Sequence, residues 1–216
     1  MANLIKGIDV SRWQGTDINW EKVKTNGYLY SFMKVTDGSA YSNKFIEMGK
    51  IQSNDAKKAG LKIGYYHFAH PSNFNGIEKD AKEEANYFLK ILKTFPTPNF
   101  PLVLDLEDEK MTLTQDETEK WIIEFKRIIT NAGFELIIYS YSDYLNRSLP
   151  KNHQLGQMPL WLASYPKVFD INVFPKNPTG WTSWIMWQYS DKGKPNGFTS
   201  TGSDLNLMTK DFFNKY

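Results

Sequence analysis

The stretch FPLVLDLEDE, residues 100–109, is an apolar run that ends in acidic residues. In a strand, successive side chains point to opposite faces of the sheet, so Val103, Asp105 and Glu107 share one face and the intervening leucines share the other. An ionised carboxylate is costly to bury unless it has a partner. The stretch therefore predicts a buried strand whose acidic end opens into a cavity. Other parts of the chain are expected to form the remaining walls of that cavity.

Seven further apolar runs have the length and composition of strands. They cover residues 4–11, 28–36, 61–69, 134–140, 160–164, 184–189 and 204–208, and the quoted stretch supplies a strand at 101–107.

Helical patterns separate the early strands, at residues 43–60, 77–93 and 114–133. The first and third end in Gly60 and Gly133, the residue type that most often follows a helix C-terminus. Strands that alternate with helices favour βαβ crossovers and a parallel sheet. About eight strands favour a sheet closed into a barrel.

The late part of the chain departs from this alternation. Residues 165–183 and 190–203 are rich in Pro, Gly and Asn and show no helical period. The chain has 216 residues, fewer than the roughly 250 typical of a complete (β/α)₈ barrel. We therefore expect an α/β protein with an irregular TIM-like β/α barrel of about eight strands and fewer than eight helices. Residues 1–216 are expected to form one domain.

Composition excludes several function classes. Basic and acidic residues number 26 and 24, and no Lys/Arg-rich block occurs, so we expect no nucleic-acid partner. The absence of cysteine excludes disulfides, thiolate metal sites and thiol nucleophiles. Aromatic residues make up 15% of the chain, and their flat apolar faces with polar tips suit sugar rings.

Polar side chains gather at the expected strand ends, where barrels of this kind bind their ligands. Four of them are carboxylates: Asp9, Asp105, Glu107 and Asp204. The others considered as substrate-binding residues are Lys34, Tyr66, Tyr139, Trp161, Tyr165 and Gln188.

Crowded carboxylates raise one another's pKa, because a neighbouring like charge disfavours ionisation. One of them can then stay protonated near neutral pH and act as a general acid. Paired acids beside aromatic faces fit glycoside hydrolysis better than other chemistries. His67 and His70 were considered as metal ligands, but residues three apart on a strand face opposite ways, so we expect neither a metal nor another cofactor.

Five motifs, in this order, resemble those of the glycoside hydrolase family 25 lysozymes. They are GIDVSRWQG (7–15), GYYHFA (64–69), LVLDLE (102–107), LWLASY (160–165) and MWQYSDKGKPNGFTSTGSDLN (186–206). The resemblance spans nearly the whole chain and implies an irregular β/α barrel. It also implies an N-acetylmuramidase that cleaves the β-1,4 bond between N-acetylmuramic acid and N-acetylglucosamine in peptidoglycan.

The resemblance carries roles to matching residues. It implies that Glu107 is the catalytic acid and Asp105 its partner, that Asp9 and Asp204 are the acids of the opening and closing motifs, and that Tyr66 and Tyr139 line the cleft. Asp37 stands where the family usually has Glu, and we expect this departure to leave the role of Lys34 intact.

Two acids on one face of a strand reach a sugar from the same side. We therefore expect the substrate's own 2-acetamido oxygen to attack the anomeric carbon, as in substrate-assisted glycosidases. Asp105 would orient the acetamido group, Glu107 would protonate the leaving oxygen, and Asp9 or Asp204 would hold the pair.

Two other functions remain open at this point. One is a chitinase-like hydrolase, although that pattern needs an acid where this chain has Val103. The other is a carbohydrate-binding barrel without catalysis, which would require the loss of one of the four acids.

The expected partner is the glycan strand of bacterial peptidoglycan, bound by a monomeric catalytic domain without membrane insertion. The start, MANLIKGIDVSRWQG, has no long apolar region and does not resemble a signal peptide. We therefore expect synthesis in the bacterial cytoplasm and action on the cell wall, with release helped by a holin if the chain is a phage endolysin. The sequence leaves phage or bacterial origin open.

Overall fold

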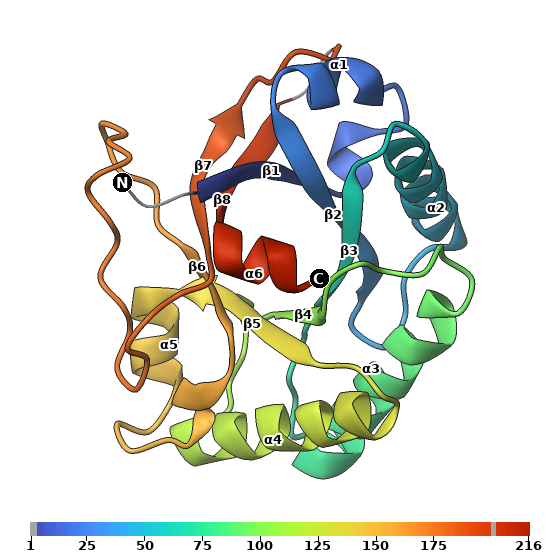
Figure 1. Ribbon diagram of the computed structural model, residues 1–216. Coiled ribbons are helices and arrows are strands. Elements are labelled where there is room, and N and C mark those ends of the chain that lie inside the picture. Colours follow the sequence, from blue (N-terminus) through green and yellow to red (C-terminus); the bar gives the residue numbers. More distant parts are fainter. Residues whose placement is uncertain (1–3, 200–201) are drawn as a thin grey trace.

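The computed structural model describes residues 4–199 and 202–216. Eight strands close into a barrel in chain order, as Figure 1 shows. They are β1 (Leu4–Val10), β2 (Tyr28–Asp37), β3 (Lys62–Phe68), β4 (Leu102–Asp105), β5 (Leu136–Tyr141), β6 (Leu160–Ala163), β7 (Met186–Gly193) and β8 (Ser203–Thr209). The irregular β/α barrel predicted from the sequence is confirmed.

The last strand runs against the others. β1 to β7 pair in parallel, whereas β8 is antiparallel to both of its neighbours, β7 and β1. The expectation of parallel strands throughout was therefore wrong for β8. Only residues 194–202 connect it to β7, and a parallel connection needs a crossover of about a dozen residues or more. Because β8 is reversed, its beginning, and not its end, lies at the mouth of the barrel.

Helices cover one side of the barrel. The three predicted helices are present as α2 (Asn43–Lys58), α3 (Ile77–Leu92) and α4 (Gln115–Asn131), and they lie at the right and bottom of Figure 1. α2 is followed by Gly60 in the left-handed conformation that its sequence predicts (φ 82°). α4 begins with a capping box between Thr114 and Glu117.

Short helices were not predicted, because they hold too few residues to show a period. They are α1 (Trp20–Thr25), α5 (Ser142–Ser148) and α6 (Lys210–Lys215), with 3₁₀ turns η1 (Arg12–Gln14) and η2 (Leu155–Gln157). This gives six α-helices in the part of the chain that the structure describes. None of them combines the length and hydropathy that crossing a membrane requires.

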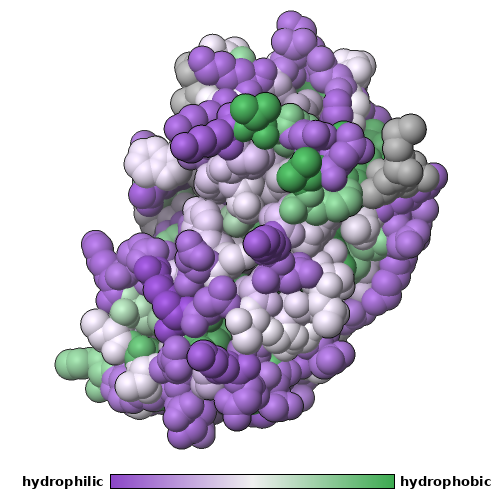
Figure 2. All heavy atoms as spheres, turned by 90° about the vertical axis from the view of Figure 1, so that its left-hand side faces the viewer, coloured by the Kyte–Doolittle hydropathy of each residue, from purple (hydrophilic) through white to green (hydrophobic). Residues whose placement is uncertain are grey.

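The connection between β6 and β7 has no helix, as predicted for residues 165–183. It forms the orange loop at the left of Figure 1, and Figure 2 shows that side of the molecule, with green apolar side chains scattered among purple polar ones. Among the described residues of 190–203 there is no helix either, and β7 continues into this segment as far as Gly193, which pairs with Ser203 of β8. Residues 200–201 of that segment and residues 1–3 lie outside the described residues.

The inside of the barrel is filled by large side chains at the end opposite the acids. Tyr30, Phe32 and Phe100 contact one another there, with ring centroids 5.4–6.1 Å apart. α6 lies across this end, in the middle of Figure 1, and its Phe213 ring is 6.2 Å from that of Tyr30. The closed end leaves the opposite mouth as the place where a ligand can enter.

Candidate active site

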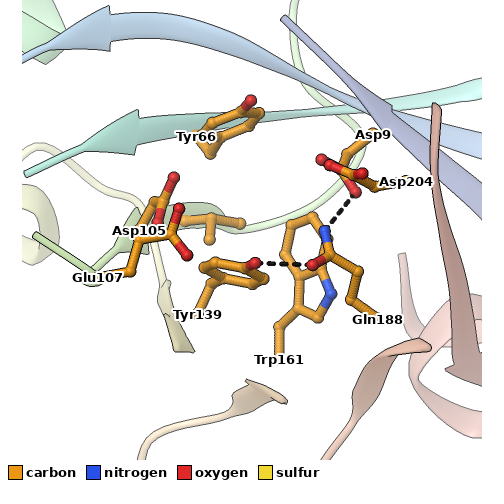
Figure 3. Close-up of a pocket in the computed structure, with 9 residues that line it drawn as sticks. Asp9, Tyr66, Asp105, Glu107, Tyr139, Trp161, Gln188 and Asp204 are labelled. Atoms are coloured by element: carbon orange, nitrogen blue, oxygen red, sulfur yellow. Dashed lines mark hydrogen bonds between the residues drawn. The ribbon is translucent and has the colours of Figure 1, made fainter. Parts of the chain in front are cut away.

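A pocket opens at the mouth of the barrel and holds about 60 Å³ of free space. All four predicted carboxylates line it, together with aromatic and amide side chains. The lining residues are Asp9, Tyr66, Val103, Asp105, Glu107, Tyr139, Trp161, Gln188 and Asp204. Figure 3 shows Asp105 and Glu107 on one side and Asp9 and Asp204 on the other, with Tyr66 and Tyr139 between them.

Asp105 and Glu107 reach the pocket from the end of β4. The strand ends at Asp105, two residues earlier than predicted, and its register partner Phe68 is the last residue of β3. Glu107 lies just beyond the strand but still lines the pocket. The predicted pairing of the two acids at one site therefore holds in the structure, although the second acid is not on the strand.

Burial controls the charge of this first pair. Asp105 is only 5% exposed, and one oxygen of each carboxyl group, Asp105 Oδ1 and Glu107 Oε2, has no hydrogen-bond partner among the described residues. Burial raises the pKa of both groups, and the Glu107 charge raises that of Asp105 further, while Lys34 opposes the rise. The pair consequently retains a proton well above the usual range of a carboxyl group.

The second pair results from the reversed direction of β8. Asp9 on β1 and Asp204 on β8 are direct register partners, so their side chains are neighbours on one face. Asp9 Oδ2 accepts hydrogen bonds from Gln188 Nε2 (2.8 Å) and Asn206 Nδ2 (2.7 Å). Burial and the adjacent Asp9 charge raise the pKa of Asp204 to about 9. Burial raises the pKa of Asp9 too, but the hydrogen bonds from Asn206 and Gln188 oppose that rise, so Asp9 is the member of this pair that ionises first.

Asp9 or Asp204 was expected to hold the Asp105–Glu107 pair. Among the described residues, however, the side chain of Asp9 accepts hydrogen bonds from the two amides and not from that pair. The second pair lies across the pocket from the first (Figure 3) and acts on it through its charge, which raises the pKa of Asp105 and of Glu107.

Gln188 connects the aromatic wall to the second pair. The hydroxyl groups of Tyr139 and Tyr165 both donate to its Oε1, at 2.7 Å and 2.5 Å, and this fixes the amide so that Nε2 faces Asp9. Trp161 donates from Nε1 to Asn206 Oδ1 (2.9 Å), which orients the second amide. The order of strands β5, β6, β7 and β8 around the barrel brings these groups together.

Two predicted residues lie outside the pocket lining. Tyr165 acts on it through Gln188, and Lys34 forms an ion pair with Asp37 (Nζ to Oδ2, 2.5 Å). Sequence reasoning missed Tyr141, whose hydrogen bond lowers the pKa of Glu107 against the effect of burial. Tyr141 lies two residues from Tyr139, so the strand alternation that selected Tyr139 also pointed to Tyr141.

The described residues contain no group of three or more His, Asp or Glu side chains placed to hold a metal ion. His67 lies inside the protein, between Thr36 Oγ1 (2.8 Å from Nδ1) and Glu84 Oε2 (2.8 Å from Nε2), as expected for a hydrogen-bonded core histidine.

Comparison with known proteins identifies the family to which this site belongs. The family model described as glycosyl hydrolases family 25 matches residues 8–198, a range that includes the first pair and Asp9. The chain belongs to glycosyl hydrolase family 25.

Relatives of this family 25 domain include proteins named as lysozymes. It is 29% identical to lysozyme M1 of Streptomyces globisporus over 89% of this chain and 64% of that protein. It is 34% identical to a lysozyme of Streptococcus phage Cp-7, over 85% of this chain and 49% of that protein. The chain thus spans about half to two thirds of the length of these relatives.

Solved structures agree with the barrel. A bacterial lysozyme from Streptomyces coelicolor matches with a TM-score of 0.77 and 27% identity, over 94% of this chain and 91% of that one. The spore cortex lytic enzyme SleM of Clostridium perfringens matches with a TM-score of 0.78 and 26% identity, over 95% and 67%.

Proposed function

We propose that the family 25 domain is an N-acetylmuramidase, which hydrolyses the β-1,4 bond between N-acetylmuramic acid and N-acetylglucosamine in peptidoglycan. The observation that carries the proposal is the buried Asp105–Glu107 pair, which retains a proton inside a pocket at the barrel mouth. The lysozymes among its relatives support the substrate class.

In the first step Glu107 donates its proton to the glycosidic oxygen, and the bond from that oxygen to the anomeric carbon breaks. The carbonyl oxygen of the substrate's acetamido group bonds to the anomeric carbon and gives a cyclic oxazolinium ion. In the second step Glu107 takes a proton from water, and the water oxygen opens that ring at the anomeric carbon. Both steps invert the anomeric carbon, so the β configuration returns.

Asp105 suits the role of acetamido partner. Its Oδ1 has no hydrogen-bond partner within residues 4–199 and 202–216, so it is available to accept a hydrogen bond from the acetamido N–H. Such a bond favours the charged form of Asp105 and leaves the proton of the pair on Glu107, where the first step needs it.

Asp9 provides a negative charge across the pocket. Its hydrogen bonds from Gln188 and Asn206 favour its ionised form against the effect of burial, and they fix the carboxylate while a positive charge develops at the anomeric carbon. A prearranged charge in a site shielded from water stabilises such a transition state strongly. Asp204 stays protonated beside Asp9, and its proposed role is to support Asp9 rather than to take part in either step.

Clearing of a suspension of bacterial cell walls tests the proposal. The protein is expected to lower the turbidity of the walls, and to leave a suspension of chitin unchanged. Binding to walls without clearing would favour the carbohydrate-binding barrel, and clearing of chitin would favour the chitinase-like enzyme. All four acids are present in the pocket, and position 103 carries no acid, which argues against both.

Net retention of configuration is a second expected outcome. Proton NMR of the earliest products should show the β-anomer at the new reducing end, because the acetamido route inverts the anomeric carbon twice. An initial α-anomer would contradict the route. A 2-deoxy-2-fluoro glycoside found bonded to Asp9 or Asp204 would replace the acetamido group by an enzyme nucleophile.

Removal of metal ions is expected to leave the rate unchanged, because every proposed step uses carboxyl groups, the substrate and water. Dialysis against EDTA followed by the turbidity assay measures this. A large loss of rate that zinc restores would contradict the proposed chemistry.

We further propose that the domain acts on the bacterial cell wall as a monomer. The phage and autolytic lysozymes among its relatives support the location of the substrate. Synthesis in the cytoplasm, release with a holin and the absence of nucleic-acid and membrane partners remain predictions.

A further inference from the structure

His70 lies between two carboxylates at the barrel mouth, next to the pocket but outside its lining. Its Nε2 is 2.7 Å from Asp37 Oδ1, and its Nδ1 is 2.7 Å from Asp108 Oδ2. A neutral imidazole carries a single N–H, so two contacts with carboxylate oxygens require both nitrogens to be protonated. The hydrogen bonds to Asp37 and Asp108 raise the pKa of His70 to about 9, and the side chain is therefore a cation at neutral pH.

Asp37 connects His70 to the cation beside the first acid pair. Its second oxygen, Oδ2, is 2.5 Å from Lys34 Nζ. Lys34 also lies over the ring of Phe68, with Nζ 4.2 Å from the ring centroid. The Lys34 charge lowers the pKa of Asp105 and Glu107 against the effect of burial. A residue that holds Asp37 in place therefore also holds the Lys34 charge, which lowers the pKa of Asp105 and Glu107.

Asp108 connects His70 to the other side of the pair, since it directly follows Glu107 in the chain. Its Oδ1 accepts a hydrogen bond from the Lys110 N–H (2.9 Å), which closes a tight turn after Glu107. His70 holds the remaining oxygen of this carboxylate. The imidazole thus restrains the segment that aims Glu107 at the pocket.

His70 is itself held firmly. Its backbone N–H lies 3.2 Å and 3.3 Å from the two carboxylate oxygens of Glu84 on α3, which is only 3% exposed. Gly38, at φ 54°, allows the close approach of the imidazole: a Cβ at this position would lie 3.0 Å from His70 Cδ2. One side chain therefore joins the end of β2 to the segments that follow β3 and β4.

We propose that His70 is a positioning residue for the hydrolysis, which holds Lys34 through Asp37 and Glu107 through Asp108. The proposal rests on the proposed function of the Asp105–Glu107 pair. His70 touches neither the pocket nor the reacting atoms, so its contribution comes from where it keeps the other two side chains.

The charges around His70 fix the direction of its effect on pH dependence. It faces Asp37 and Lys34 from β2, Asp108 from the segment after β4, and Glu84 from α3. Replacing His70 by a neutral residue removes one positive charge and releases Lys34 from its fixed place. Both changes favour the protonated forms of Asp105 and Glu107, so their pKa values rise. The pH profile of kcat/KM then moves to higher pH.

His70→Gln and His70→Arg test this proposal, measured as kcat, KM and pH profile on cell walls. We expect His70→Gln to lower kcat about tenfold with little change in KM, because a misplaced acid affects the chemical step more than binding. Its pH profile should move up by about half a unit. His70→Arg, which keeps a forked cation between the two carboxylates, should restore most of the rate and the original profile.

His153→Gln is the matched control. His153 is also hydrogen-bonded, with Nε2 2.9 Å from Thr179 O, but unlike His70 it is buried, and it lies away from the pocket lining. Its loss should lower Tm without moving the pH profile. An unchanged profile in His70→Gln, or no recovery in His70→Arg, would overturn the proposal. Glu107→Gln measured in parallel separates the two ideas, because an active Glu107→Gln would contradict the proposed function itself.

Discussion

Glu107→Gln is expected to lower kcat on cell walls by about 10²–10⁴-fold, the usual contribution of general acid–base catalysis. Glutamine has nearly the same shape but carries no acidic proton, so the leaving oxygen would depart without protonation. Binding to the walls and the fold should persist, because one Glu107 oxygen has no hydrogen-bond partner to lose among the described residues. The turbidity assay gives the rate and a wall pull-down gives the binding.

Glu47→Gln is the matched control for this variant. Glu47 lies on α2, is well exposed and forms a surface ion pair with Lys50, so its loss should leave the rate near that of the unaltered protein. If Glu107→Gln kept more than a tenth of the activity, Glu107 would not be the general acid.

Asp105→Asn has the second largest expected effect, a loss of about 10²-fold or more in kcat. Asparagine cannot supply the negative charge that orients the acetamido N–H and stabilises the oxazolinium ion. The substitution also removes the neighbouring charge from Glu107. The pKa of Glu107 should therefore fall, and the basic limb of the pH profile, where the acid loses its proton, should move to lower pH.

The pH profile distinguishes this role from a purely structural one. Asp55→Asn, on the exposed face of α2, serves as the control and should change neither kcat nor the profile. A basic limb that stays in place in Asp105→Asn, or a rate within tenfold of the unaltered protein, would show that Asp105 is not the partner of Glu107.

Much of this site follows from strand alternation alone. The spacing of Val103, Asp105 and Glu107 predicted acids at the end of a buried strand, and the same reasoning applied to each strand end selected the groups that line the pocket. The absence of a helix between β6 and β7 could also be predicted, because Pro, Gly and Asn interrupt any helical period in that segment. Both features could be predicted because they depend on the residues of a single short segment.

What could not be predicted depends on partners distant in sequence. The direction of β8 follows from the short connection after Gly193, and with that direction Asp9 and Asp204 become register partners. The role of His70 depends on Asp37 and Asp108, 33 and 38 residues away, whose side chains meet it only in the folded barrel. A single sequence shows each residue type but not which carboxylate faces which cation.

Mass spectrometry of digested peptidoglycan tests the central proposal most directly. Purified cell walls treated with the protein, and reduced with borohydride to mark new reducing ends, should yield fragments that end in reduced N-acetylmuramic acid. Walls treated with Glu107→Gln should yield almost none. Fragments that end in reduced N-acetylglucosamine, or cleavage confined to the peptides, would contradict the assignment of this domain as an N-acetylmuramidase.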